Sequence, residues 1–332
     1  MLNKQNRIIV LIEKEMERSA PVSFELLRAG RELSHKSGEI LSACVIGRDI
    51  HELSEELSYY ADEVIMLDNP LLANFEADVW ASALASLCEV AEPTTVIMGH
   101  NYDNLELAPK LAFRTGSDLT TDCVHLERDE GKGKLLCTKP IYGGNAVVVM
   151  AIESKPQMVT LRAKVWHALK KTESKGHIVS FDCKPELFTT RTESVDLVPG
   201  ESVSLDKADA IVSAGRGVKS AEAVLELDGI VKAFGQYFDH VELGSSRPLV
   251  DAGILPRSRQ VGQTGEKVSP QLYVAVAISG AAQHVSGIVA SKKVVAINKD
   301  PDAPIFEAAD YGVVASYEDV LPGLINKLEE LS

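Results

Sequence analysis

Short apolar runs alternate with amphipathic helical patterns through the first third of the chain. The apolar runs predict strands over residues 7–13, 40–46, 64–67 and 95–99. Helical periodicity fills the gaps and predicts helices between Pro21 and Gly38, over 77–91 and over 105–114, with Ser19 and Gly38 as start and stop signals of the first helix. Strands that alternate with helices of this length indicate βαβ units around a parallel sheet.

The pattern changes after residue 120, where β-branched and alternating residues predominate. Four such runs predict antiparallel strands over residues 121–128, 134–141, 145–152 and 158–161, with glycines at 131, 133, 143 and 144 in turns. The stretch that follows, 170–201, is polar and is interrupted by Pro185, Pro199 and Gly200. We interpret it as a linker or an exposed crossing segment.

A second α/β rhythm begins at Ala208. It predicts a strand before a Gly-Arg-Gly turn, a helix from Val218, strands over 272–278 and 294–297, and further helices near 281 and 318. A chain of 332 residues is also longer than a single core usually grows. The predicted fold is therefore α/β with two Rossmann-like domains: an amino-terminal βαβ domain with added antiparallel strands over residues 1–200, and a smaller doubly wound domain over 205–332.

Composition and charge narrow the possible functions. The chain is 45% hydrophobic and 25% charged, as in ordinary globular proteins, and no apolar run reaches the roughly 20 residues that span a bilayer. The net charge of −14 argues against nucleic acid or an anionic membrane as the main partner. The sequence enters a strand directly and shows no leader, so a cytoplasmic location is expected.

Residues that could carry metal or hydrolytic chemistry are dispersed. The five cysteines include no CxxC pair, and the eight histidines are scattered along the sequence. Neither a zinc or iron–sulfur site nor a nucleophile with a paired base is indicated. We predict no metal site and no catalytic residue, and we interpret the cysteines as buried, reduced thiols.

The most informative region is residues 246–310, where four glycine- or alanine-rich turns lie between β-rich runs. They read SRPLVDAG (246–253), VGQTG (261–265), SGAAQHVSG (279–287) and AINKDPDAPIFEAADYG (296–312). A Gly-Arg-Gly turn at 215–217 precedes them. Strand-to-helix turns of this kind direct backbone N–H groups and a helix start toward a phosphate. The series suits a folded dinucleotide.

Side chains in the strand-to-helix turns could contact such a ligand, and each has a plainer alternative. Arg216, together with Ser279 and Gly280, suits a pyrophosphate, but Arg216 could equally lie solvated in a tight turn. His284 falls in the first turn of a predicted helix, where the dipole lowers an imidazole pKa and leaves one hydrogen bond to donate. Its alternative is local capping or packing.

The remaining turns also carry candidate ligand contacts. Arg247 could tune a redox cofactor through its permanent charge, or form a surface salt bridge with Asp251 or Glu242. In VGQTG, glycines at 262 and 265 permit unusual backbone angles, so that the side chains of Gln263 and Thr264 could reach a ligand. The alternative is that the segment is only a hairpin turn.

The last of the four turns follows a strand at its carboxyl end, where open α/β sheets bind ligands. It offers Asn298, Lys299 and Asp300. Asp310, ten residues further on, could accept a hydrogen bond from a ribose or adenine donor, or could serve only as a cap.

In this order, the turns resemble the carboxy-terminal FAD-binding domain of electron-transfer flavoprotein alpha subunits. The amino-terminal part is also similar to that family in residues 97–123 and 139–148, so the resemblance covers nearly the whole chain. Pro248, Glu266 and Lys139 depart from the family's commonest pattern. The resemblance implies a doubly wound FAD-binding domain over 205–332 and an amino-terminal domain that packs against a partner subunit.

The resemblance also implies a role for individual residues. Arg247 would lie against the isoalloxazine ring, Thr264 would bond near N5, and His284 would stand by the pyrimidine carbonyl. Gln263 would meet the ribityl chain or ring edge, and Asn298 and Asp310 would serve the adenosine. The residues expected at the cofactor are Arg216, Ser246, Arg247, Gln260, Val261, Gly262, Gln263, Thr264, Gly265, Ser279, Gly280, Gln283, His284, Asn298, Lys299, Asp300 and Asp310.

By the same resemblance, the chain would pair with an electron-transfer flavoprotein beta subunit that holds a second FAD or AMP. It would be an electron carrier rather than a substrate-transforming enzyme, exchanging electrons with an acyl-CoA dehydrogenase or related flavoenzyme, as in fatty acid beta-oxidation. NADH oxidation and electron bifurcation depend on the beta subunit. The alternatives are a stand-alone nucleotide-dependent oxidoreductase and a non-redox subunit that binds an adenine nucleotide.

Overall fold

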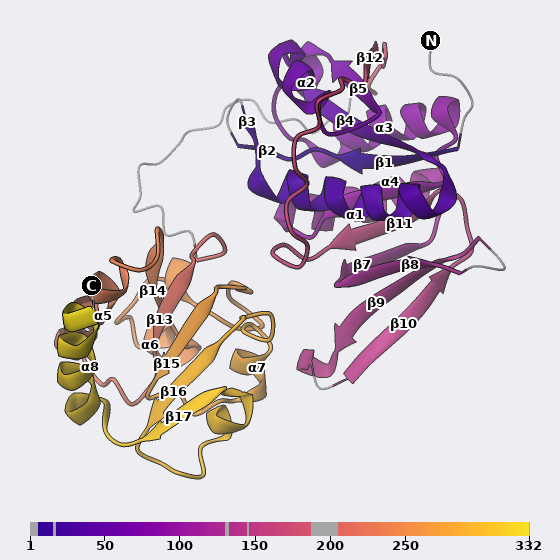
Figure 1. Ribbon diagram of the computed structural model, residues 1–332. Coiled ribbons are helices and arrows are strands. Elements are labelled where there is room, and N and C mark those ends of the chain that lie inside the picture. The colour runs from indigo at the N-terminus through magenta and orange to yellow at the C-terminus, as the bar shows by residue number, and fades with distance from the viewer. Residues whose placement is uncertain (1–5, 16–17, 130–132, 145, 187–204, 332) are drawn as a thin grey trace. The chain divides into compact units, whose positions relative to one another are not determined.

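The computed structural model describes residues 6–15, 18–129, 133–144, 146–186 and 205–331. The chain divides into two compact units, one of residues 1–140 and 147–196 and the other of residues 141–146 and 197–332. Each unit is built on its own parallel sheet (Figure 1). Within the described part of the chain, no helix combines the length and the apolar character needed to cross a membrane.

Seven parallel strands form the sheet of the amino-terminal unit, in the order β12-β5-β4-β1-β6-β11-β7. Their bounds are β1 (Arg7–Leu11), β4 (Ile40–Gly47), β5 (Glu63–Asp68), β6 (Thr95–Gly99), β7 (Leu119–Cys123), β11 (Gln157–Leu161) and β12 (His177–Ser180). β1, β6 and β11 are buried at every position. Because helices cover both faces of such a sheet, its central strands read as continuous apolar runs.

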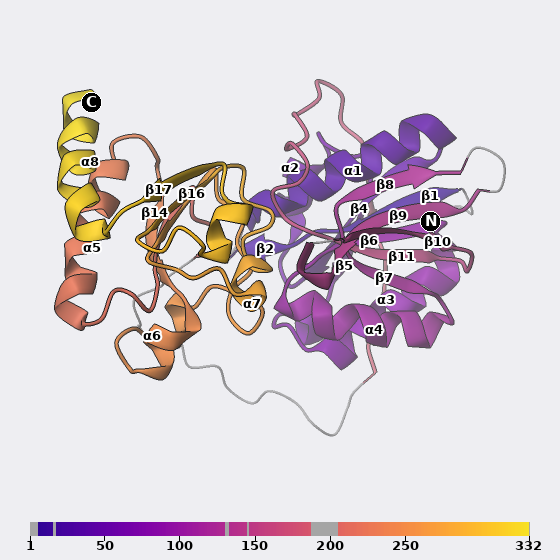
Figure 2. The same ribbon diagram turned by 90° about the horizontal axis from the view of Figure 1, so that it is seen from below.

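The faces of this sheet are covered by different elements (Figures 1 and 2). α1 (Pro21–Ser37) and α2 (His51–Leu57) contribute to the core on one face, and α3 (Ala77–Ala91), α4 (Tyr102–Thr115) and the 3-10 turn η1 (Pro70–Leu72) to the core on the other. A three-stranded sheet adds side chains to the α1 face; it consists of β8 (His125–Arg128), β9 (Leu135–Ile141) and β10 (Ala146–Ile152). Two further short strands are β2 (Lys14–Glu15) and β3 (Arg18–Ser19), whereas the 3-10 turn η2 (Tyr142–Gly144) belongs to the second unit.

Three expectations for this region are wrong. β7 and β11, expected to be antiparallel, run parallel within the main sheet, whereas β8 and β9 do pair antiparallel. Residues 177–180, inside the expected linker, form the edge strand β12, and 187–201 lie outside the described residues. Ser19 belongs to β3 and does not cap α1, which begins at Pro21, where the missing N–H leaves no bond unmade. Local alternation cannot reveal the direction of a neighbouring strand.

The carboxy-terminal unit contains five parallel strands in the order β14-β13-β15-β16-β17. Their bounds are β13 (Ala210–Ala214), β14 (Val241–Ser245), β15 (Leu272–Val276), β16 (Val294–Asn298) and β17 (Tyr311–Val314). The other elements are α5 (Ala221–Phe234), α6 (Arg247–Asp251), η3 (Arg257–Arg259), α7 (Ala282–Val285), η4 (Pro304–Ala308) and α8 (Tyr317–Leu331).

The two faces of the five-stranded sheet are covered unequally. The long helices α5 and α8 lie side by side on one face (Figure 1). The other core contains Val261, Val268, Ile288 and Ile305, so loops and the short α7 and η4 cover that face. The parallel sheets of the two units confirm the predicted fold class, α/β with two Rossmann-like domains.

The strand order also locates a topological switch point in each sheet. β13 lies between β14 and β15, so the chain leaves β13 to one side and later crosses to the other. In the larger sheet, β1 lies in the same way between β4 and β6. Open α/β sheets bind ligands in the crevice outside the carboxyl ends of the strands at such a point. Each unit therefore has one edge where a ligand is expected.

Candidate functional site

The predicted cofactor residues, except Asp310, converge on the carboxyl edge of the five-stranded sheet. Turns after β13, β14, β15 and β16 carry Arg216, Ser246 with Arg247, Ser279 with Gly280, and Asn298 with its neighbours, respectively. Because these strands are parallel, their carboxyl ends lie at one edge. The tertiary structure thus brings together residues as far apart in the sequence as Arg216 and Asn298.

Main-chain hydrogen bonds hold the loop of residues 260–265 at the same edge. The N–H of Val261 donates to the carbonyl of Ser245 at the end of β14, at 2.8 Å. The N–H of Gln263 donates to the carbonyl of Gln283 in α7, at 2.7 Å. The loop is therefore joined to β14 through Val261 and to α7 through Gln263.

The turns at the switch point pack main chain against main chain. A Cβ on Gly215 would overlap the carbonyl of Ala277, and one on Gly280, where φ is +87°, would overlap the backbone of Ile305. Ala277 itself has a φ of +53°, which costs an L-residue about 1–2 kcal/mol. Strain of this kind concentrates at sites where the backbone is positioned for a function.

His284 is the most unusual side chain of the site. It is 7% exposed, and its Nε2 lies 2.9 Å from the hydroxyl of Tyr273, which is completely buried. Burial lowers the pKa of His284 to about 4, and the backbone carbonyl of Val261 opposes the shift only in part. Burial likewise raises the pKa of Tyr273. Both groups are therefore neutral at pH 7.

The structure corrects the expected reason for a neutral His284. The low pKa was attributed to a helix dipole, but α7 contains four residues, and desolvation is the largest cause. The Nδ1 atom is buried and makes no hydrogen bond within the described residues. A buried ring nitrogen without a partner is an unsatisfied polar group beside the loop of residues 260–265.

The other predicted ring contacts differ in their exposure. Gln260 is buried and donates through Nε2 to the Thr264 hydroxyl at 2.9 Å, while Gln263 and Thr264 are exposed. Arg247 and Asp251 form an ion pair of 3.2 Å in which the two side chains are 64% and 61% exposed. The salt-bridge alternative for Arg247 is therefore present, with Asp251 and not with Glu242, and it leaves most of the guanidinium accessible.

Asn298 connects the turns that follow β15 and β16. Its Nδ2 donates to the carbonyl of Ile278 at 2.8 Å, and its Oδ1 accepts from the N–H of Asp300 at 3.0 Å. Lys299 and Asp300 are exposed. Asn298 thus fixes the spacing of the two turns, and the side chains of its neighbours remain accessible at the edge.

Asp310 is not brought to this edge, so its expected contact with adenosine is wrong. It precedes β17 and lies beside Val294 at the amino ends of the strands. Its carboxylate accepts from Lys293 Nζ at 2.7 Å and from the N–H of Val294 at 2.8 Å, and these bonds lower its pKa. The capping alternative is the one that the structure supports.

Sequence reasoning missed Ala315 and Ser316, which lie at the carboxyl end of β17, where Asp310 was expected. The N–H of Ala315 donates to the carbonyl of Asn298 at 3.1 Å, and Ser316 follows, with its hydroxyl on Asp319 at 2.7 Å. The signal was the short β-branched run of Val313 and Val314, which leads into a serine just before a helix.

The donor set at this edge fits an anionic dinucleotide. Arg216, Arg247 and Lys299 are exposed cations in three of the turns, and the glycines at 215 and 280 allow main chain to approach closely. The Nδ1 of His284 is buried and makes no hydrogen bond within the described residues. Positive side chains, close main chain and a helix start are the features that hold a pyrophosphate.

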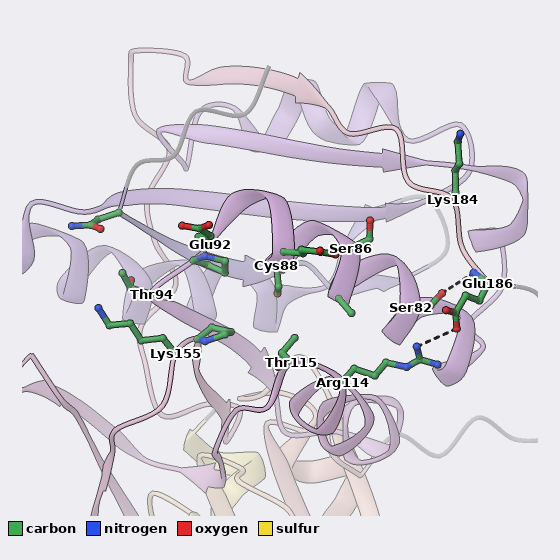
Figure 3. Close-up of a pocket in the computed structure, with 15 residues that line it drawn as sticks. Ser82, Ser86, Cys88, Glu92, Thr94, Arg114, Thr115, Lys155, Lys184 and Glu186 are labelled. Atoms are coloured by element: carbon green, nitrogen blue, oxygen red, sulfur yellow. Dashed lines mark hydrogen bonds and ion pairs between the residues drawn. The ribbon is translucent and has the colours of Figure 1, made fainter.

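A groove of about 860 Å³ in the amino-terminal unit contains none of the predicted residues (Figure 3). Arg114 and Glu186 pair across it at 3.1 Å, and the N–H of Glu186 donates to the Ser82 hydroxyl at 3.0 Å. Thr94 and Pro156 line it just before β6 and β11 begin. The groove thus lies at the amino ends of these strands, opposite the edge where open sheets bind ligands.

The chain is similar to known proteins over nearly its whole length. The family model described as "Electron transfer flavoprotein domain" matches residues 8–185, and "Electron transfer flavoprotein FAD-binding domain" matches residues 204–289. The electron transfer flavoprotein subunit alpha of Thermoanaerobacterium thermosaccharolyticum is 37% identical over 99% of this chain and 100% of its own length. The protein of that name from Bacillus subtilis is 35% identical over 98% of both. The acryloyl-CoA reductase electron transfer subunit beta of Anaerotignum propionicum is 31% identical over 99% and 97%, respectively.

Proposed function

Because this chain belongs to the electron transfer flavoprotein alpha-subunit family, we propose that it carries one FAD at the carboxyl edge of its five-stranded sheet. The convergence of the turns after β13, β14, β15 and β16 with the loop of residues 260–265 is the observation that supports this most strongly. In this proposal, residues 205–332 form the FAD-binding domain and residues 1–200 the domain that packs against the beta subunit.

The proposed contacts follow the order of the strands. Ser279, Gly280 and Arg216 flank the switch point and would hold the pyrophosphate. Arg247 and Thr264, exposed on the β14 side of the sheet, would face the flavin ring. On the other side, Asn298 and Ser316 at the ends of β16 and β17 would define the adenosine end.

The chain's own residues would position the flavin and set its potential. FAD supplies the one- and two-electron redox chemistry when it is bound. A guanidinium stays charged under all ordinary conditions, so Arg247 would stabilise negative charge on the ring and raise the potential. His284 stays neutral because its pKa is about 4, so it would offer a hydrogen bond without adding charge.

The partner proteins follow from the family. An alpha subunit implies a beta subunit, and we propose that it holds a second FAD or AMP. The name of the Anaerotignum relative connects that protein to an acryloyl-CoA reductase. We therefore propose a flavoenzyme of the acyl-CoA dehydrogenase type as the protein that exchanges electrons with this heterodimer.

The test of the cofactor is to produce the chain together with its beta subunit and to record a spectrum during stepwise reduction with dithionite. We expect a yellow complex with flavin in the carboxy-terminal unit, and loss of that flavin in Gly280→Ala but not in Gly253→Ala. Both glycines have positive φ, but a Cβ at 253 meets nothing within 4 Å. A colourless complex would contradict the proposal. So would oxidation of a substrate by this chain in the absence of the beta subunit.

Titration of the same complex with NADH separates the two subgroups of the family. Rapid bleaching of two flavins in each heterodimer would indicate an electron-bifurcating protein. Bleaching only after addition of an acyl-CoA dehydrogenase and its substrate would indicate a simple carrier.

A further inference from the structure

Tyr273 and His284 form a buried polar pair, and the side chain of the buried Ser213 also acts on the Tyr273 hydroxyl. Tyr273 belongs to the core cluster beneath α7 and the loop of residues 260–265, together with Ile211, Val261 and Ile288. The hydroxyl of Tyr273 and the Nε2 of His284 are 2.9 Å apart, and the two rings are inclined by 55° with their centres 6.0 Å apart. Because buried polar groups are costly without partners, each group restrains the other.

The pair constrains where the imidazole proton resides. Burial keeps both groups neutral, so the ring carries one N–H. If the phenol donates to Nε2, the single ring proton is on Nδ1. The backbone carbonyl of Val261 raises the pKa of His284 against the effect of burial, as a nearby acceptor does. Nδ1 has no satisfied hydrogen bond within the described residues.

The main chain of Gln283 and His284 lies against the loop of residues 260–265. The carbonyl of Gln283 accepts from the N–H of Gln263 at 2.7 Å, and a Cβ on Gly262 would crowd that same carbonyl. The loop begins with Gln260, which donates to Thr264 at 2.9 Å. The main chain of Gln283 and His284 therefore lies against the loop that presents Gln263 and Thr264, and the Val261 backbone of that loop acts on the imidazole.

We propose that Tyr273 is a positioning residue for the flavin site: it donates to Nε2 of His284, fixes the Nδ1–H form of the imidazole, and through it sets the position of the loop of residues 260–265. The inference rests on the proposed FAD site for its functional consequence. Tyr273 itself is completely buried and would not touch the cofactor.

The experiment compares Tyr273→Phe with Tyr237→Phe in the complex with the beta subunit. Tyr237 is the control because its hydroxyl also makes a short hydrogen bond, 2.6 Å to the carbonyl of Leu328, but from the turn after α5 to α8. Three properties are measured: the ¹⁵N chemical shifts of the His284 ring, which report the tautomer, the dissociation constant of FAD, and its midpoint potential.

We expect Tyr273→Phe to move the His284 shifts away from the Nδ1–H form, to weaken FAD binding about fivefold and to change its potential, because a hydrogen bond of this kind contributes on the order of 1 kcal/mol. Tyr237→Phe should change neither. If Tyr273→Phe leaves the tautomer and the potential at the values of the control, the proposal is overturned.

A double-mutant cycle with His284→Gln tests whether Tyr273 acts through His284. We expect Tyr273→Phe to have little further effect on FAD affinity in the His284→Gln background, since the group through which it acts is absent. Independent, additive losses would overturn the proposal. A wild-type complex without flavin would refute the FAD assignment instead, and the ring shifts would still test the influence of Tyr273 on His284.

Discussion

Both units have a sheet edge at a topological switch point, but that edge is filled by side chains in one unit and open in the other. In the amino-terminal unit, the edge at the switch point is filled by the chain's own charged side chains: Glu13 lies against Gly99, and Lys14 lies against Gly47. In the carboxy-terminal unit, the corresponding edge consists of glycine turns and exposed polar side chains. A shared fold therefore does not imply a shared function, since the residues at the edge decide what can bind.

Hydrogen bonds consolidate the filled edge of the amino-terminal unit. Glu13 accepts from Asn104 Nδ2 at 2.9 Å, and Arg162 pairs with Asp122 through two contacts of 2.8 Å. These groups satisfy one another, as buried polar groups must. The alternative in which the amino-terminal domain binds an adenine nucleotide receives no support from this edge.

The units also bury titratable groups of opposite kind. Burial raises the pKa of Glu13 from 4.5 to about 7, with Asp103 as a further cause, although bonds from Asn101 and Asn104 oppose the shift. Burial lowers the pKa of His284 from 6.5 to about 4. One unit therefore loses stability as pH rises and the other as pH falls.

Gly280→Ala is expected to have the largest effect on stability. Residue 280 has a positive φ, which an alanine would adopt only with strain, and its Cβ would overlap the backbone of Ile305. We expect a loss of about 4 kcal/mol from the carboxy-terminal unit, measured by hydrogen exchange of its peptides in the full chain. Gly253→Ala, strained but unobstructed, should cost about 1 kcal/mol. Equal losses would mean that the turns are less tightly packed than the structure indicates.

Acidification should destabilise the carboxy-terminal unit through His284. Because its native pKa is below that of the unfolded chain, the unfolded state binds the proton first, and stability falls as pH drops from 6.5 to about 4. This difference in pKa corresponds to about 3 kcal/mol. Hydrogen exchange against pH should show the decrease in the wild type and a flatter profile in His284→Gln. An unchanged slope in the variant would rule out His284 as the origin.

The amino-terminal unit should respond to pH in the opposite direction. The native pKa of Glu13 is above its unfolded value, so its contribution is fully present below pH 4.5 and is lost as pH rises through about 7. We expect a loss of about 2 kcal/mol over this range, because the carboxyl retains some contact with water. Glu13→Gln should abolish this dependence in peptides of the amino-terminal unit. A wild-type profile in that variant would contradict the pKa assigned to Glu13.

Arg247→Ala should have the smallest effect on stability and a clear effect on the cofactor. The ion pair with Asp251 is more than half exposed on both sides, so its loss should cost a few tenths of a kcal/mol. The potential of bound FAD should nevertheless fall, because a permanent positive charge beside the ring is removed. Potentiometric titration of the heterodimer measures this. Asp251→Ala is the control, since it breaks the same pair and keeps the charge.

Much of the fold could be predicted from local pattern. The helix over 77–91 has the expected bounds, and α1 ends at Ser37, just before the predicted stop Gly38, whose φ is +70°. The buried strands β1, β4 and β6 were predicted because continuous apolar runs are typical of a parallel sheet with two covered faces. The direction of β7 and β11 could not be predicted, because it depends on which strands they meet.

Some features of the candidate site could also be predicted from the sequence, whereas others could not. The turns around Arg216, Ser279 and Asn298 were predicted from glycine spacing and strand ends, and they converge at one edge. The position of Asp310 was wrong because β17 is short, and the sequence does not show at which end of it a neighbouring aspartate will lie. The cause of the low pKa of His284 was also wrong, since burial depends on the loop that covers it.

By itself, the amino-acid sequence determined the elements, their glycine boundaries and the kind of ligand that the turns suit, because these depend on interactions between residues that are close along the chain. The tertiary structure alone decided which strands are neighbours, that Glu13 and Lys14 fill one edge, and that Tyr273 meets His284. Those features arise from burial and from contacts between distant segments, which exist only when the chain is folded.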